Sequence, residues 1–276
     1  MRRRRAGGPA GDAATVGLAG GSGRGAVVGL VGRVGRDPLL TAGLGAAYTA
    51  FALTFRGPRP AFWQRMTATG LALGSLALAT EPKLRRSRVR GRDVATGLAS
   101  AAGLYGIFMV GDRMVRRLLK RGGEDIGDVY ALRELGPVPE LAARLALVIG
   151  PAEELFWRGF VNARLQRRLG RWPGAAAGSF AYAGAHVATG NFTLFGAAGV
   201  AGAYWSALAA AGMPMGALVV SHAAWDVLTF LVAPTPPAKP GRRPLDAMSD
   251  LTAGAAGSVV AEGAAAAVAR FNPWSG

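Results

Sequence analysis

The sequence predicts an all-helical bundle that crosses a membrane several times. Of its 276 residues, 51% are hydrophobic and the mean hydropathy is +0.26, but the distribution of charge is more informative. No Asp, Glu, Lys or Arg occurs between Arg171 and Asp226, and none occurs between Asp226 and Lys239. Residues 39–55 and 94–111 are also free of these charges. Because about 20 apolar residues in a helix cross a bilayer, such stretches predict membrane helices.

We expect about seven membrane helices, because seven apolar segments of sufficient length follow one another between short polar loops. The second segment contains Arg65, whose long side chain can extend to the lipid headgroups from a position near the end of the span. The segments are 38–55, 62–80, 94–111, 141–161, 173–188, 192–211 and 214–233.

The chain divides into four parts by composition. Residues 1–37 are basic and rich in Gly and Ala, which predicts a disordered tail on the cytoplasmic side. Residues 38–135 contain the first membrane helices and then an interfacial segment of mixed charge. Residues 136–233 form the predicted functional core. Residues 234–276 begin with a Pro-rich linker and predict a flexible tail.

The net charge of +16 is arranged in short clusters between apolar segments. Nucleic-acid binding is disfavoured, because no single face interleaves basic and aromatic residues. The segment 81–93 contains six Lys and Arg residues, which predicts a cytoplasmic loop and contacts with anionic lipid headgroups. The abundance of Ala, Gly and Arg is typical of a bacterial protein, so we expect a multi-pass protein of the plasma membrane. The absence of cysteine excludes disulfides, thiolate metal sites and cysteine nucleophiles.

Two adjacent glutamates, Glu153 and Glu154, interrupt the fourth apolar segment. Glu154 precedes Arg158 by four residues, the favourable order for an ion pair on one helix face. Pro151 follows a glycine and predicts a helix start or a sharp kink, which would place both acids in a first turn stabilised by the helix dipole. Glu153 lies about 100° around the helix from its neighbour and lacks that cation, so we interpret it as the candidate general base.

The only two histidines, His186 and His222, both fall in predicted membrane helices. His222 precedes Asp226 by four residues, so the two share a helix face, as for an imidazole oriented by a carboxylate or for two ligands of one metal. Tyr182 precedes His186 at the same interval and would place its ring over the imidazole. Carboxylates and imidazoles without a thiol or a phosphate loop are suited to activating water for hydrolysis.

Each of these features also has a purely structural explanation. A single histidine in a membrane helix often forms a helix–helix hydrogen bond, and the Glu154–Arg158 pair can be structural. Tyr182, Trp157 and Phe160 are typical packing residues. These explanations become weak only in combination, because both histidines of the chain fall in the same pattern.

The combined pattern resembles the three-motif signature of the CPBP family. This family comprises CAAX proteases and bacteriocin-processing enzymes, also called Abi proteins, which are intramembrane metalloproteases related to the type II CAAX prenyl endopeptidases. The order, spacing and membrane placement of the motifs agree over residues 136–233. The motifs are Glu153-Glu154-x-x-x-Arg158, an aromatic-x-x-x-His ending at His186, and His222-x-x-x-Asp226.

Two positions depart from the commonest family pattern. Tyr182 stands where Phe is usual, which we interpret as a change in packing. Asp226 stands where the family has Asn or Asp, which allows a charged partner for His222 in place of a neutral amide that could bind an oxyanion.

The resemblance implies hydrolysis of peptide bonds inside the membrane, with Glu153 as the general base on a water. It leaves two mechanisms open. In one, a divalent metal, zinc foremost, is bound by the two histidines with Glu154 or Asp226. In the other, the same groups act without a metal by orienting the water and stabilising the oxyanion. The implied catalytic residues are Glu153, Glu154, His186, His222 and Asp226, supported by Arg158 and Tyr182.

Two other functions remain open from the sequence. A non-catalytic membrane scaffold, such as an immunity-type interaction protein, could use the same fold. A proton- or cation-coupled transporter could use the three buried acids, but the chain contains no internal repeat of the kind found in such transporters. For the hydrolase, the expected substrate is a peptide or a membrane protein that the sequence does not specify further.

Overall fold

The computed structural model describes residues 37–118 and 127–234, and every regular element in these two stretches is helical. The predicted all-α fold class is therefore confirmed. The tails predicted for residues 1–36 and 235–276 lie outside the described residues.

Helices follow one another in chain order with short connections. The first group consists of α2 (Pro38–Arg56), η1 (Arg59–Ala61), α3 (Phe62–Thr80), η2 (Leu84–Arg86) and α4 (Gly91–Leu118). The second consists of η3 (Ala131–Leu135), α6 (Val138–Arg144), η4 (Leu145–Ile149), α7 (Gly150–Glu154), η5 (Leu155–Asn162) and α8 (Ala163–Leu169). The third consists of α9 (Arg171–His186), η6 (Val187–Thr189), α10 (Phe192–Ala211), α11 (Met215–Val227) and η7 (Leu228–Val232).

Four helices are long and apolar enough to cross a membrane: Pro38–Arg56, Gly91–Val115, Phe192–Ala211 and Met215–Val232. The number rises to five if Gly127–Leu135 and Val138–Leu169, which meet at 107°, are counted as one bent span. By length and composition, α3 and α9 do not qualify, so the predicted count of about seven spans stays a prediction. The third predicted span, 94–111, is part of a longer helix, because α4 continues to Leu118.

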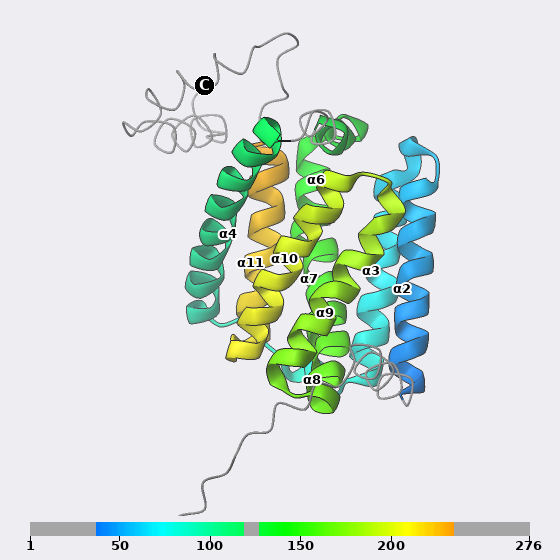
Figure 1. Cartoon of the computed structure of the whole chain (residues 1–276), viewed down its shortest axis with the longest axis vertical. Helices are drawn as coiled ribbons and strands as arrows, with labels where there is room; N and C mark the ends of the chain where they lie inside the picture. Colours follow the sequence, from blue (N-terminus) through cyan, green and yellow to red (C-terminus); the bar gives the residue numbers. More distant parts are fainter. Residues whose placement is uncertain (1–36, 119–126, 235–276) are drawn as a thin grey trace, which may run out of the picture.

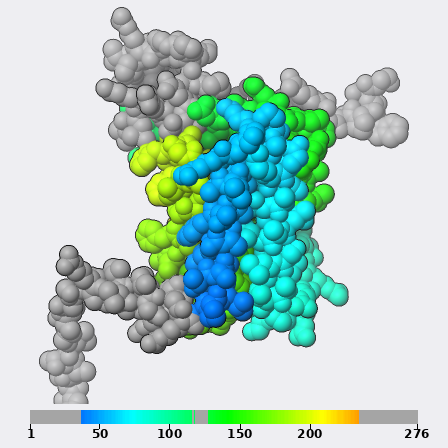
Figure 2. Space-filling view, turned by 90° about the vertical axis from the view of Figure 1, so that its right-hand side faces the viewer, coloured from blue at the N-terminus to red at the C-terminus, as the bar shows by residue number. Residues whose placement is uncertain are grey.

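The bundle places the second group of helices at its centre. Figure 1 shows α2 and α3 on one side and α4 with α11 on the other, while α9 and α10 run across the front. In Figure 2, α2 and α3 lie side by side and form one outer face. The largest buried cluster contains Phe51, Phe156, Trp157 and Phe160, and it joins α2 to the central helices. The central segment that contains Glu153, Glu154 and Arg158 is therefore enclosed by the other helices.

The chain remains helical from Val138 to Leu169, so the predicted helix start at Pro151 is wrong, while the alternative of a kink stays a prediction. The proline is accommodated because Leu145–Ile149 forms a π-helical turn, in which the N–H of Gly150 bonds to the carbonyl of Leu145. Such a wider turn relieves the clash between a proline ring and the preceding turn. Consequently both glutamates lie inside a continuous helix, and the helix dipole does not stabilise them.

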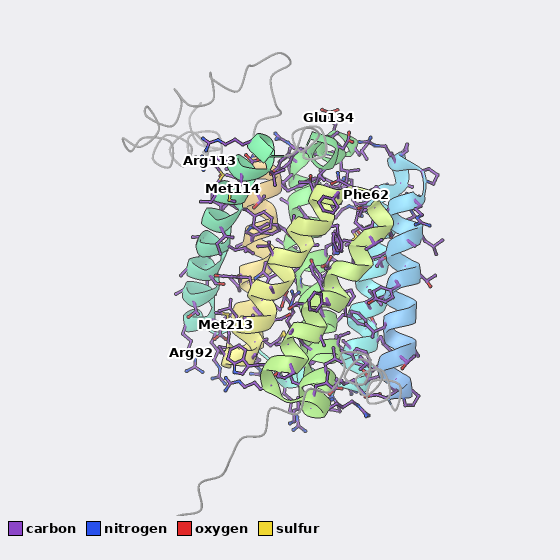
Figure 3. The ribbon with its side chains drawn as sticks, in the orientation of Figure 1. Phe62, Arg92, Arg113, Met114, Glu134 and Met213 are labelled. Carbon is purple, nitrogen blue, oxygen red and sulfur yellow. The ribbon has the colours of Figure 1, made fainter. Side chains whose placement is uncertain are left out.

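Charged side chains gather at the two ends of the bundle. Figure 3 shows Arg92 and Met213 near one end, and Phe62, Arg113 and Glu134 near the other. The basic helix α8, which contains Arg164, Arg167 and Arg168, lies at the same end as Arg92. The loop 81–93, predicted to be cytoplasmic, and α8 are therefore on one side, and Arg113 is on the opposite side.

A network of ion pairs fastens α8 to the end of the bundle. Arg164 lies 3.1 Å and Arg168 3.3 Å from the Asp37 carboxylate, while Arg167 lies 3.2 Å from Glu81. Burial raises the pKa of Asp37, but a backbone N–H in the first turn of α2 and the Arg164 guanidinium outweigh it, so the pKa lies below its ordinary value of 3.8. The network joins the start of α2 and the end of α3 to α8.

Candidate active site

The Glu154 carboxylate is fully buried and paired on one oxygen with two donors. Its Oε1 accepts hydrogen bonds from Arg158 Nη1 at 2.9 Å and from His222 Nδ1 at 2.7 Å. The predicted Glu154–Arg158 ion pair is thus present. Because a carboxylate oxygen can only accept, Nδ1 of His222 carries a hydrogen. Arg158 also donates to the carbonyl of Gly202 at 3.4 Å, so the guanidinium connects the central helix to α10.

Glu153 points to different partners, on α9. Its Oε2 accepts a hydrogen bond from the Tyr182 hydroxyl at 3.0 Å. The interpretation of Tyr182 as a packing residue alone is therefore wrong, because its hydroxyl binds a carboxylate. The ring centroids of Tyr182 and His186 are 4.8 Å apart and the rings are tilted by 54°, so the aromatic ring lies next to the imidazole as predicted, but not parallel to it. His186 Nδ1 lies 3.0 Å from the Tyr182 carbonyl and must donate to it, so Nε2 of a neutral ring is an acceptor.

Asp226 lies on the other side of His222, with Oδ1 3.6 Å from Nε2 of the ring. Beside these groups is a cavity of about 520 Å³ whose remaining lining is largely apolar and aromatic, with side chains from α3, α4, α10 and α11. Glu154 is not among the lining residues. The predicted site residues that do line the cavity are Glu153, Tyr182, His186, His222 and Asp226.

Two glycines allow the helices to approach closely enough for these contacts. A Cβ at Gly150 would lie 3.0 Å from the Cα of Ala223, so a side chain there would push α7 away from α11. A Cβ at Gly202 would lie 2.9 Å from the Tyr182 ring, so glycine makes room for the tyrosine between α9 and α10. Gly150 therefore lets α7 and α11 approach each other, and Gly202 lets α10 approach the Tyr182 ring.

Trp205 on α10 is a neighbour of the site that the sequence did not reveal. Its indole stacks on the His222 ring with centroids 3.9 Å apart and an angle of 18°. Its Nε1 donates to the Ser221 hydroxyl at 3.0 Å, which in turn donates to Ser100 on α4 at 2.9 Å. The stack fixes the plane of the imidazole. The sequence gives no indication of which face of α10 packs on His222, because α10 is composed almost uniformly of small and apolar residues.

The described residues do not bring three ligands of the zinc set that the family resemblance implied around one point, and a bound metal stays a prediction. Nδ1 of His222 is hydrogen-bonded to Glu154, and its Nε2 faces Asp226 at 3.6 Å. His186 uses Nδ1 for a backbone carbonyl. Within 37–118 and 127–234, no three His, Asp or Glu side chains are grouped as metal ligands. No chemical step is therefore derived through a metal.

Residues 138–228 match the family model described as type II CAAX prenyl endopeptidase, Rce1-like. This part of the chain belongs to the CAAX protease family. The resemblance stated from the three motifs is confirmed, since residues 138–228, called the CAAX-protease segment below, contain every motif residue. Comparisons with curated proteins and with solved structures found no match. The family and the apolar helices together indicate a membrane protein.

The site also receives residues from outside the CAAX-protease segment. Phe51 and Phe55 of α2 pack on the His186 ring, with centroid distances of 5.3 and 6.0 Å. From α4, Ser100 is bonded to Ser221, next to His222. The helices that precede the CAAX-protease segment therefore contact His186 directly and the residue next to His222.

Proposed function

We propose that this protein is an intramembrane endopeptidase that hydrolyses peptide bonds of membrane-associated substrates. The observation that supports the proposal is the shared cavity, into which a carboxylate, two imidazoles and a second carboxylate face from three helices. Such a set can activate water and stabilise the charge that develops on a carbonyl oxygen. The apolar lining of the cavity suits a substrate segment that comes from the bilayer.

In the proposed reaction, Glu153 and His186 act on the attacking water. The water donates one hydrogen bond to the free Oε1 of Glu153 and the other to Nε2 of His186. Glu153 takes a proton as the water oxygen attacks the carbonyl carbon, and a tetrahedral oxyanion forms. When the carbon–nitrogen bond breaks, the same carboxyl group returns the proton to the leaving amine, which gives one new carboxyl end and one new amino end.

His222 is the proposed oxyanion partner. Its Nδ1 donates to Glu154, and in the imidazolium form its Nε2 also carries a hydrogen that can be donated to the oxyanion in the cavity. Glu154 and Asp226 flank the ring, and their two negative charges favour its positive charge. Arg158 pairs with Glu154, so the two carboxylates are balanced by two cations. Glu154 and Arg158 therefore support the site without touching the substrate.

We further propose that α3 and α9 also lie at membrane depth, which gives about seven spans in a bacterial plasma membrane with the α8 end in the cytoplasm. The positive-inside rule supports this orientation, because the loop 81–93 and α8 share one end. Since the chain has no cysteine, single cysteines at the two ends of α3 can be labelled from either side of the membrane. Labelling of both ends of α3 from the same side would contradict the span, and labelling of its α8 end from outside would contradict the orientation.

The test of the function is proteomics of new protein termini in membranes that contain either the wild type or Glu153→Gln. We expect a set of cleavage products that depends on Glu153. Equal sets of termini in the two membranes, with equal expression, would contradict the proposal and favour a scaffold. Metal analysis of the purified protein, with chelation and zinc addition, tests the separate expectation of a bound metal.

A further inference from the structure

Tyr182 on α9 contacts two groups of the proposed site, one with its hydroxyl and one with its backbone carbonyl. Its hydroxyl donates to Oε2 of Glu153 at 3.0 Å, and its backbone carbonyl accepts the hydrogen bond of His186 Nδ1 at 3.0 Å. The Arg158 guanidinium lies over its ring, 4.7 Å from the centroid. The side chain is 5% exposed, so the geometry is enclosed on most sides.

The hydroxyl has a consequence that ring packing alone does not have. A carboxylate on a glutamate side chain can rotate and present either oxygen, and an apolar cavity offers few groups to hold it in place. A hydrogen bond to an ionised oxygen is stronger and shorter than a neutral one, so it fixes the side-chain torsions of Glu153. With Oε2 held by Tyr182, Oε1 is the oxygen left for the water.

We propose that the Tyr182 hydroxyl is a positioning group, which holds Oε2 of Glu153 so that Oε1 takes the proton of the attacking water. The inference rests on the proposed function. Because phenylalanine is usual at this position in the family that the sequence resembles, the family motif itself does not supply this hydroxyl. It is a feature of this chain.

Tyr48 provides a matched comparison. Its hydroxyl donates from α2 to the carbonyl of Ala181 at 3.3 Å, the residue directly before Tyr182 on α9. Tyr48→Phe and Tyr182→Phe each remove one phenolic hydroxyl and one hydrogen bond between α9 and a neighbouring helix. Only the second change removes a hydrogen bond to a carboxylate.

The kinetic test uses a fluorescence-quenched peptide, taken from a cleavage site found in the terminal proteomics, with the full chain in liposomes. For Tyr182→Phe we expect kcat to fall about 10- to 100-fold with KM unchanged, as when the positioning partner of a catalytic group is removed. For Tyr48→Phe we expect both constants to equal those of the wild type. Wild-type kcat in Tyr182→Phe would overturn the inference, and so would an equal loss in both variants.

A spectroscopic readout does not depend on turnover. In protein labelled with ¹³C-glutamate, the infrared band of Glu153 is identified by its loss in Glu153→Gln. We expect this carboxylate band to shift in Tyr182→Phe and to stay in place in Tyr48→Phe. If the wild type cleaves the peptide and the band does not shift, the inference fails while the proposed function stands. A wild type that cleaves no protein overturns the proposed function, and with it the positioning role.

Discussion

Replacing Arg158 by methionine tests whether the buried ion pair is required for stability. Both partners are sequestered, with side-chain exposures of 1% for Arg158 and 0% for Glu154. Removing one member of such a pair leaves an uncompensated charge and costs about 3–5 kcal/mol. We expect the lower end, about 3 kcal/mol, because His222 Nδ1 still donates to the same oxygen at 2.7 Å. A loss of this size corresponds to a fall in Tm of about 6–12 °C for a chain of this length.

The assay is unfolding of the purified protein in mixed micelles with increasing SDS, followed by tryptophan fluorescence. Trp157 and Trp205 are buried next to the pair, so their fluorescence changes when this part of the protein unfolds. Arg158→Lys retains the positive charge and should be intermediate between the wild type and Arg158→Met. Glu140→Gln is the surface control, because the Glu140–Arg144 pair at 2.7 Å has one half-exposed partner and contributes about 0–1 kcal/mol.

Two results would refute this reasoning. If Arg158→Met unfolds within about 1 kcal/mol of the wild type, the buried carboxylate does not depend on the guanidinium. If the lysine and methionine variants are equally unstable, the lost stability comes from packing and not from charge.

The remaining predictions concern the proposed base, the acid limit of stability and the approach of two helices. Glu153→Gln and His186→Ala should each lower cleavage by about 100- to 10,000-fold without loss of membrane insertion, and an active variant would remove that residue from the site. Because the folded pKa of Asp37 is lowered, its carboxylate stabilises the fold above its ordinary pKa of 3.8, and this contribution is lost as the pH falls through the folded value. The stability difference between wild type and Asp37→Asn should therefore be constant near neutral pH and shrink in acid, and a difference that is independent of pH would contradict the assignment. Gly150→Ala should reduce both cleavage and Tm because its Cβ meets the backbone of α11, whereas Gly45→Ala, whose Cβ meets nothing within 4 Å, should be neutral or stabilising by up to about 1 kcal/mol.

The features that could be predicted from the sequence depend on short-range spacing. Glu154 and Arg158 form the expected ion pair, and His222 and Asp226 lie on one helix face, because a four-residue interval fixes neighbours on any helix. The helices themselves follow from the long stretches without charge. The candidate residues of separate helices also lie together, since Glu153 and His222 line one cavity.

The features that could not be predicted depend on contacts between helices. Trp205 and Ser221 meet beside the imidazole because α10 and α11 pack together, and nothing in the local sequence of either helix indicates this pairing. Pro151 was interpreted from its usual position at a helix start, but a π-helical turn accommodates it inside the helix. For Tyr182, composition could not decide between packing and a polar contact, since the ring does both.

The arrangement explains why two neighbouring glutamates can serve different purposes. Two carboxylates at adjacent positions repel each other, and an apolar surrounding makes each charge costly. Glu154 receives a guanidinium and an imidazole on one oxygen, so its charge is compensated and its orientation is fixed. Glu153 receives one neutral donor, Tyr182, and faces the cavity. The 100° between successive helical residues separates the two surroundings, which lets a compensated acid hold the histidine while the less compensated acid remains available to water.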